Sequence, residues 1–113
     1  MSITIEPKDA TLGASITGID LAQLDDANWD IVKQAFLEFG VLIFPMQALS
    51  DDAQIAFASR FGELETELAA ISNERANGEV VDHNDLPYWI LRGNERWHID
   101  SSFKPLAAKA SCL

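Results

Sequence analysis

The sequence has one cysteine, Cys112, so an internal disulfide is excluded. Basic residues are also few: 8 Lys and Arg stand against 18 Asp and Glu, and the formal net charge is −10. Nucleic acids and anionic membranes both bind proteins through clustered Lys and Arg, and the basic residues here are scattered. We therefore expect neither a nucleic-acid nor a membrane partner, and the cysteine usage favours the reducing cytoplasm.

Several sequence motifs are absent. No apolar run approaches the roughly 20 residues that a membrane-spanning helix needs, and the first residues lack the basic and apolar regions of a signal peptide. There is no glycine-rich phosphate loop and no Gly-x-Ser-x-Gly nucleophile motif. Cys112 has no nearby histidine on a shared face, which argues against a catalytic thiol.

The residues that are present predict a small folded domain of the α+β class. Hydrophobic residues make up 48 % of the 113 residues, enough for a packed core. Trp29, Val32 and Phe36 repeat at helical spacing between a capping Asp25 and a terminating Gly40. The expected strands are 3–5, 12–21, 41–44 (buried), 71–73 and the segment around 98–100. The expected helices are 25–40 and 50–62. A tight turn is expected at 77–78, and a polar loop is expected over 82–96, where Pro87 and Gly93 are interpreted as breaks in regular structure.

The segment Trp97–Phe103 contains the best candidate for a functional site. In a strand, residues two apart point to the same face, so His98 and Asp100 can converge on one point. A histidine and a carboxylate on one face form most of the facial site of non-haem Fe(II) oxygenases. Trp97 and Phe103 are expected to wall this site and limit the access of water. The alternative is a surface strand in which the two polar side chains only hydrogen-bond.

His83 is the one other histidine, and it lies in a polar stretch. It is either an ordinary loop residue or a third ligand, in which case the chain is a small metal-binding protein that uses His83, His98 and Asp100. The paired carboxylates Asp25–Asp26 and Asp51–Asp52 stand where helix capping explains them.

A resemblance that spans the whole chain is carried, in this order, by residues 13–14 with 18–21, 39–44, 57–64 and 97–103. The chain resembles the N-terminal part of the Fe(II)- and 2-oxoglutarate-dependent dioxygenases of the taurine dioxygenase and dichlorophenoxyacetate dioxygenase family. Ile71–Asn73 and Asp100–Phe103 are more similar to the dichlorophenoxyacetate branch.

The resemblance implies a double-stranded β-helix (jelly-roll) fold, of which residues 1–113 would be a single N-terminal segment without the C-terminal half. It implies that His98 and Asp100 are the first two Fe(II) ligands. The second iron histidine, and the threonine and arginine that contact 2-oxoglutarate, are expected beyond Leu113. The residues expected at the substrate site are Asn94, Asn73, Ser102 and Phe103.

The implied reaction consumes O2 and 2-oxoglutarate, releases succinate and CO2, and hydroxylates a small carboxylate of the aryloxyalkanoate type. Glu67 replaces a histidine of the taurine enzymes, which argues against a sulfonate substrate. The resemblance also implies a homo-oligomer for the full-length form. The alternative function is a catalytically inactive truncated fragment, or a module that needs a second chain to complete its site.

Overall fold

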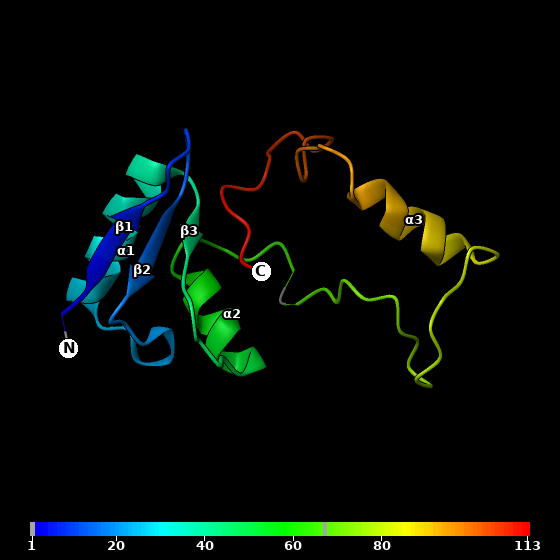
Figure 1. The fold of residues 1–113 in the computed structure, drawn as a ribbon, viewed down its shortest axis with the longest axis horizontal. Coiled ribbons are helices and arrows are strands. Elements are labelled where there is room, and N and C mark those ends of the chain that lie inside the picture. Colours follow the sequence, from blue (N-terminus) through cyan, green and yellow to red (C-terminus); the bar gives the residue numbers. More distant parts are fainter. Residues whose placement is uncertain (1, 67) are drawn as a thin grey trace. The chain divides into compact units, whose positions relative to one another are not determined.

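The computed structural model describes residues 2–66 and 68–113, so Glu67 lies outside the described residues. The chain divides into two compact units, Met1–Phe61 and Gly62–Leu113. Figure 1 shows that the first unit holds the strands and the helices α1 and α2, and that the second holds α3. No helix in the described part of the chain is long and apolar enough to span a membrane.

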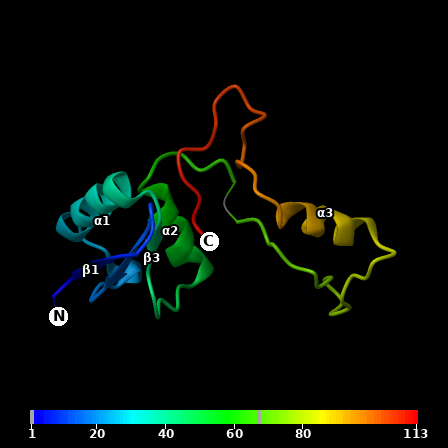
Figure 2. The ribbon, with the colours of Figure 1, turned by 45° about the horizontal axis from the view of Figure 1, so that its top comes forward.

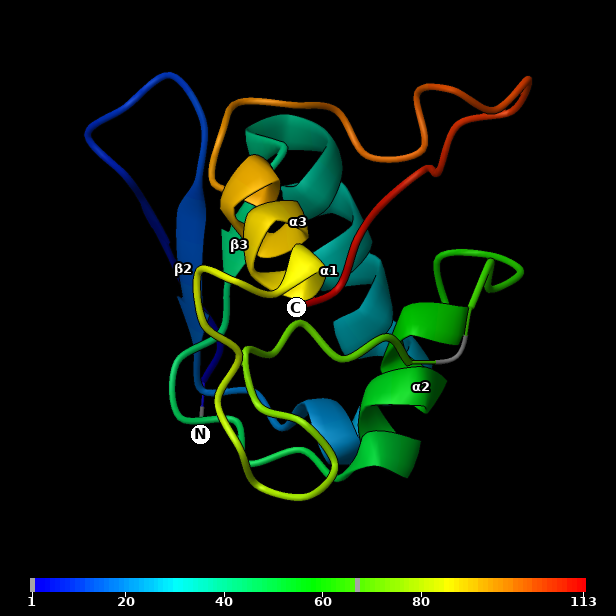
Figure 3. The same cartoon turned by 90° about the vertical axis from the view of Figure 1, so that its right-hand side faces the viewer.

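The first unit is built on a three-stranded sheet in the order β1-β2-β3. β1 (Thr4–Pro7) runs antiparallel to β2 (Ala14–Thr17), and β2 runs parallel to β3 (Leu42–Ile43). Figure 3 shows β2 and β3 side by side. Parallel neighbours need a crossover connection, and the helix α1 lies in that connection. The first two expected strands are confirmed, the second in shortened form.

The helix α1 (Asp26–Phe39) begins and ends as the sequence predicts. The Asp25 carboxylate accepts the backbone N–H of Asn28 at 2.7 Å and caps the first turn. Gly40 ends the helix in the left-handed conformation, with φ of 71°, and its N–H donates to the Phe36 carbonyl. Figures 1 and 2 show α1 along one face of the sheet. Val32 and Ala35 are buried there.

The helix α2 (Asp51–Ser59) is capped by Ser50, and it ends three residues before the predicted stop at Gly62. It packs against α1 through aromatic rings that meet edge to face. These rings come from α1, from α2 and from the segments that follow β3 and α2. We call them the aromatic cluster: Trp29, Phe36, Phe44, Phe57 and Phe61. A short 3-10 helix, η1 (Leu21–Gln23), buries Leu21 in the same unit.

The prediction of a buried strand over 41–44 is wrong in its extent and its burial. Only Leu42 and Ile43 pair, and the exposed fractions of Val41 and Ile43 are 49 % and 46 %. The reason is the position of β3, which is the edge of the described sheet and pairs with β2 alone.

The second unit contains a helix where the sequence predicts a loop. The helix α3 (Leu86–Asn94) has Pro87 in its first turn and Gly93 near its end. Proline in a first turn costs no intrahelical hydrogen bond, so neither residue prevents the helix. The expected strand over 71–73 is not formed, whereas the tight turn at 77–78 is confirmed, with Gly78 at a φ of 85°.

Candidate metal and substrate site

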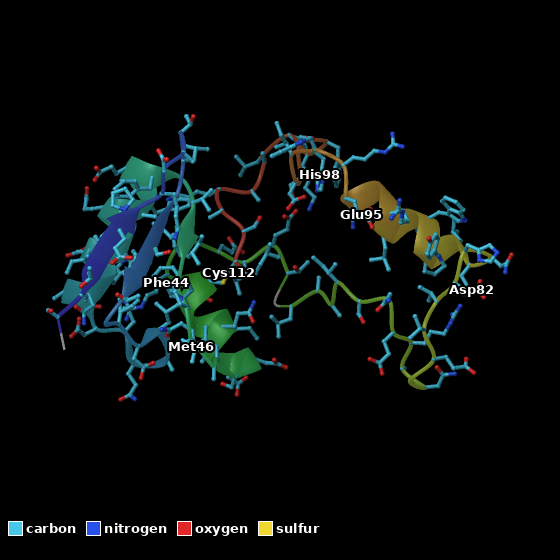
Figure 4. All side chains as sticks on the ribbon, viewed as in Figure 1. Phe44, Met46, Asp82, Glu95, His98 and Cys112 are labelled. Atoms are coloured by element: carbon cyan, nitrogen blue, oxygen red, sulfur yellow. The ribbon has the colours of Figure 1, made fainter. Side chains whose placement is uncertain are left out.

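His98 and Asp100 lie in irregular backbone after α3, so the strand predicted around them is wrong. A strand needs a pairing partner, and no described strand pairs with residues 97–103. The two side chains still converge, because Nε2 of His98 lies 2.9 Å from Oδ1 of Asp100. Figure 4 labels His98 in this segment. Both side chains are about half exposed, so solutes can reach the pair.

The hydrogen bonds of His98 fix the orientation of its ring. Nδ1 lies 2.7 Å from the carbonyl oxygen of Arg96, so a proton on Nδ1 donates to this carbonyl. Nε2 then faces the Asp100 carboxylate. The Arg96 carbonyl and, after it, the charge of Asp100 raise the pKa of His98, because both oxygens favour a ring with two protons.

The spacing of the pair is that of a hydrogen bond, as in the alternative interpretation, and it also fits a divalent metal. Two ligand atoms at neighbouring corners of an octahedron, each about 2.1 Å from the metal, lie about 3.0 Å apart. Nε2 of His98 and Oδ1 of Asp100 are 2.9 Å apart. The Arg96 carbonyl orients the imidazole from its far side, as outer hydrogen bonds do for most metal-binding histidines. The pair can therefore supply two adjacent ligands of an Fe(II) site.

His83 does not join this pair. Among residues 2–66 and 68–113, no three His, Cys, Asp or Glu side chains lie close enough to hold a metal ion. The backbone carbonyl of His83 accepts the indole N–H of Trp89 at 2.9 Å, which ties His83 to α3. The interpretation as a small protein with the ligands His83, His98 and Asp100 is therefore wrong for this fold.

The prediction that Trp97 and Phe103 wall the metal pair is also wrong. Trp97 is fully exposed and Phe103 is 85 % exposed. The reason is that segment 97–103 does not belong to a described sheet. Its side chains therefore do not alternate between a buried and an exposed face. Ser102 and Phe103 occupy the middle of a turn closed by the Lys104 N–H, which donates to the Ser101 carbonyl at 3.0 Å.

Asn73 and Asn94, both predicted at a substrate site, line one hollow of about 350 Å³ in the second unit. Asn94 comes from the end of α3 and Asn73 from the segment before the 77–78 turn. The Asn73 carbonyl accepts the N–H of Val81 at 2.8 Å, which holds this segment in place. The hollow is open to solvent, and its other lining residues are Ile71, Ser72, Leu91 and Glu95.

An ion pair between Arg75 and Asp85 links the segment that follows Asn73 to the residue directly before α3, and the sequence analysis did not predict it. Nη2 of Arg75 lies 2.7 Å from Oδ1 of Asp85, directly before α3. The backbone N–H of Asp82 donates to the other carboxylate oxygen at 3.0 Å. This N–H and then the Arg75 guanidinium lower the pKa of Asp85. The only sequence signal was the spacing of Asp82 and Asp85 before an apolar run.

The thiol of Cys112 has a raised pKa because of its partial burial. A raised pKa lowers the thiolate fraction at neutral pH, and the thiolate is the reactive form. This agrees with the expectation that Cys112 is not a catalytic nucleophile.

Residues 4–113 match the family described as "Taurine catabolism dioxygenase TauD, TfdA family". An (S)-phenoxypropionate/alpha-ketoglutarate-dioxygenase of Sphingobium herbicidovorans is 51 % identical in an alignment of 109 positions, which covers 95 % of this chain and 38 % of that protein. The protein of the same name in Delftia acidovorans is 42 % identical in an alignment of 118 positions, gaps included, which covers 97 % of this chain and 40 % of that protein.

A solved structure supports the same relationship. The crystal structure of AAD-2 in complex with Mn(II) and N-oxalylglycine is similar to this chain, with a TM-score of 0.89 and 33 % identity. The similarity covers 96 % of this chain and 40 % of the other. The chain thus spans about two fifths of the length of the relatives it matches.

Proposed function

Because the chain belongs to the TauD, TfdA family of taurine catabolism dioxygenases, we propose that it is the N-terminal part of an Fe(II)- and 2-oxoglutarate-dependent dioxygenase. The proposed substrate is a small carboxylate of the aryloxyalkanoate type, as the names of the two phenoxypropionate relatives suggest. We further propose that the complete fold is a jelly roll and that the enzyme works in the cytoplasm. The observation that carries the proposal is the 2.9 Å approach of His98 Nε2 to Asp100 Oδ1.

In this proposal His98 and Asp100 bind Fe(II), which, when bound, supplies the redox chemistry that couples O2 and 2-oxoglutarate to oxidation of the substrate. The chain's own part is to present the two ligand atoms in fixed positions. The Arg96 carbonyl holds the Nδ1 proton, so Nε2 is the nitrogen that faces the metal. Because binding needs a bare Nε2, any proton on that atom leaves when the metal binds.

The hollow beside α3 is the proposed place for part of the substrate. Asn73 and Asn94 each offer amide N–H groups that can donate to a carboxylate or an ether oxygen. Ile71 and Leu91 add apolar surface that suits an aryl ring. Glu95 also lines the hollow, and its carboxylate pairs with Arg92 at 2.9 Å, which offsets its charge near an anionic substrate.

The test uses the whole protein that carries this sequence, supplied with Fe(II) and 2-oxoglutarate. We expect succinate to form when (S)-phenoxypropionate or 2,4-dichlorophenoxyacetate is added, and to form much more slowly with taurine. The His98→Ala protein should form none above background. Equal rates with all three substrates would refute the substrate class, and full activity of His98→Ala would refute the metal assignment.

A second candidate function is a catalytically inactive fragment, or a module that needs a second chain to complete its site. The observation that favours it is the exposure of large apolar side chains in the second unit: Ile71, Leu86, Trp89, Ile90, Trp97, Ile99, Phe103 and Leu106. Exposed apolar surface of this kind marks a contact with other protein. The isolated 113-residue chain should then fail to decarboxylate 2-oxoglutarate under conditions in which the whole protein succeeds.

A further inference from the structure

We propose that Glu65 is a positioning residue for the metal pair, a role that rests on the proposed function. Glu65 precedes the pair by more than thirty residues and belongs to the same unit. Its carboxylate contacts both ends of the turn Ser101–Lys104, which follows Asp100 directly.

Each carboxylate oxygen of Glu65 has its own partner. The hydroxyl of Ser101 donates to Oε2 at 2.9 Å. The ammonium of Lys104 forms an ion pair with Oε1. The Lys104 N–H also donates to the Ser101 carbonyl, so the carboxylate spans a turn that is already closed by one backbone hydrogen bond. One side chain therefore holds the first and the last residue of the turn.

The turn needs such support because of the backbone of Ser101. Ser101 has a φ of 57°, in the left-handed region that residues other than glycine seldom adopt. Strain of this kind persists only where surrounding contacts maintain it. The bond from the Ser101 hydroxyl to Glu65 is such a contact. Without this bond, Ser101 can return to a negative φ, and the backbone that follows Asp100 then takes a different direction.

The backbone of Asp100 joins that of Ser101, so the orientation of Ser101 affects where the Asp100 carboxylate lies relative to His98. The 2.9 Å spacing of these two side chains is what suits them to one metal. The same turn carries Ser102 and Phe103 at its centre. Glu65 thus sets the geometry of the metal pair and of two predicted substrate residues without touching the metal itself.

The experiment compares three forms of the whole protein that carries this sequence by NMR: the parent, Glu65→Ala and the matched control Glu63→Ala. Glu63 is also an exposed glutamate, so Glu63→Ala changes the net charge of the protein by the same amount as Glu65→Ala. Without metal, we expect Glu65→Ala to lose the hydrogen-exchange protection of the Lys104 amide and Glu63→Ala to keep it. With added Mn(II), broadening of the His98–Asp100 amide signals should need about tenfold more metal in Glu65→Ala, a loss typical of outer contacts to metal ligands.

A charge-swapped protein, Glu65→Lys with Lys104→Glu, restores the ion pair and should recover part of the Mn(II) affinity, which a general loss of folding would not do. Unchanged Lys104 protection and unchanged affinity in Glu65→Ala would overturn the role of Glu65. Failure of Mn(II) to broaden the His98 signal in the parent whole protein would instead count against the proposed function, and the metal-free exchange experiment would still decide the role of Glu65.

Discussion

The indole ring of Trp29 meets the phenyl ring of Phe57 edge to face, with 6.4 Å between the ring centroids and 87° between the planes. Trp29 comes from α1 and Phe57 from α2, so this contact joins the two helices of the first unit. Phe57 also contacts Phe44 and Phe61 and is only 6 % exposed. Phe61 likewise contacts three rings of the aromatic cluster, and Phe57 is the more deeply buried of the two.

Replacing Phe57 with alanine should lower the free energy of unfolding of the first unit by about 3–5 kcal/mol, because it leaves a cavity where three rings met. Urea denaturation measures this loss by fluorescence in a background with Trp89→Phe and Trp97→Phe, which leaves Trp29 as the tryptophan of this sequence. The control is Leu37→Ala on the exposed side of α1, which should change the free energy by less than about 0.5 kcal/mol. Equal effects of the two substitutions would show that the cluster is not the core.

The two histidines should differ in their effect on metal binding. His98→Ala removes a ligand atom and should reduce the affinity of the whole protein for Fe(II) or Mn(II) by more than about tenfold. His83→Ala should leave the affinity unchanged, because His83 belongs to no group of metal-binding side chains in the described part of the chain. Calorimetric titration of the two variants makes the comparison. Loss of affinity in His83→Ala would restore the interpretation with three ligands.

Asn94 should contribute to substrate binding in the whole protein. A hydrogen bond to a charged group contributes about 1.5–3 kcal/mol, so Asn94→Ala should raise KM for a phenoxyalkanoate by about tenfold or more. The matched control is Asn84→Ala, which alters an exposed asparagine that does not line the hollow. Steady-state kinetics with both variants tests the assignment, which an unchanged KM in Asn94→Ala would contradict.

The Arg75–Asp85 pair should make the segment before α3 sensitive to acid. The Asp82 N–H and the Arg75 guanidinium lower the pKa of Asp85 in the folded chain. A lowered folded pKa gives stability that is present above the unfolded pKa and is lost as the pH falls through the folded value. The NMR signal of the Trp89 indole, which donates to His83 in this segment, should therefore shift on acidification below about pH 4.

Asp85→Asn is the control for that titration, because it removes the ionising group and keeps the size of the side chain. The acid-dependent part of the Trp89 shift should disappear in this variant, and Arg75→Ala should move the transition to higher pH. An identical titration in the parent and in Asp85→Asn would assign the transition to another carboxylate.

The sequence predicted those parts of the fold that depend on local patterns. Asp25 and Gly40 mark both ends of α1, and the spacing of Trp29, Val32 and Phe36 gives its packed face. The helix α3 was missed because Pro87 and Gly93 were interpreted as breaks, although both stand near a helix end. The error there was to judge residue types without their position in the turn.

For the candidate site, the convergence of His98 and Asp100 was predicted correctly from a strand that does not form. A strand forms only where another segment pairs with it, and the alternation of polar and apolar residues over a few positions does not show whether such a partner exists. The contacts of Glu65 with Ser101 and Lys104 were missed for the same reason, since they join positions far apart in the sequence. The pairing of His98 with Asp100 could be predicted from residue type and spacing, whereas the contacts that hold the pair could not.

The second unit has little apolar burial of its own: among its described residues, only Val81 is a buried hydrophobic residue. Its order depends mainly on polar contacts such as Arg75 with Asp85 and Glu65 with Lys104. The heat-capacity increase on unfolding comes from newly hydrated apolar surface, so this unit contributes little to it. In a calorimeter, the heat-capacity change on unfolding of the 113-residue chain should be close to that of residues 1–61 alone. Unfolding of the second unit should add little to this change.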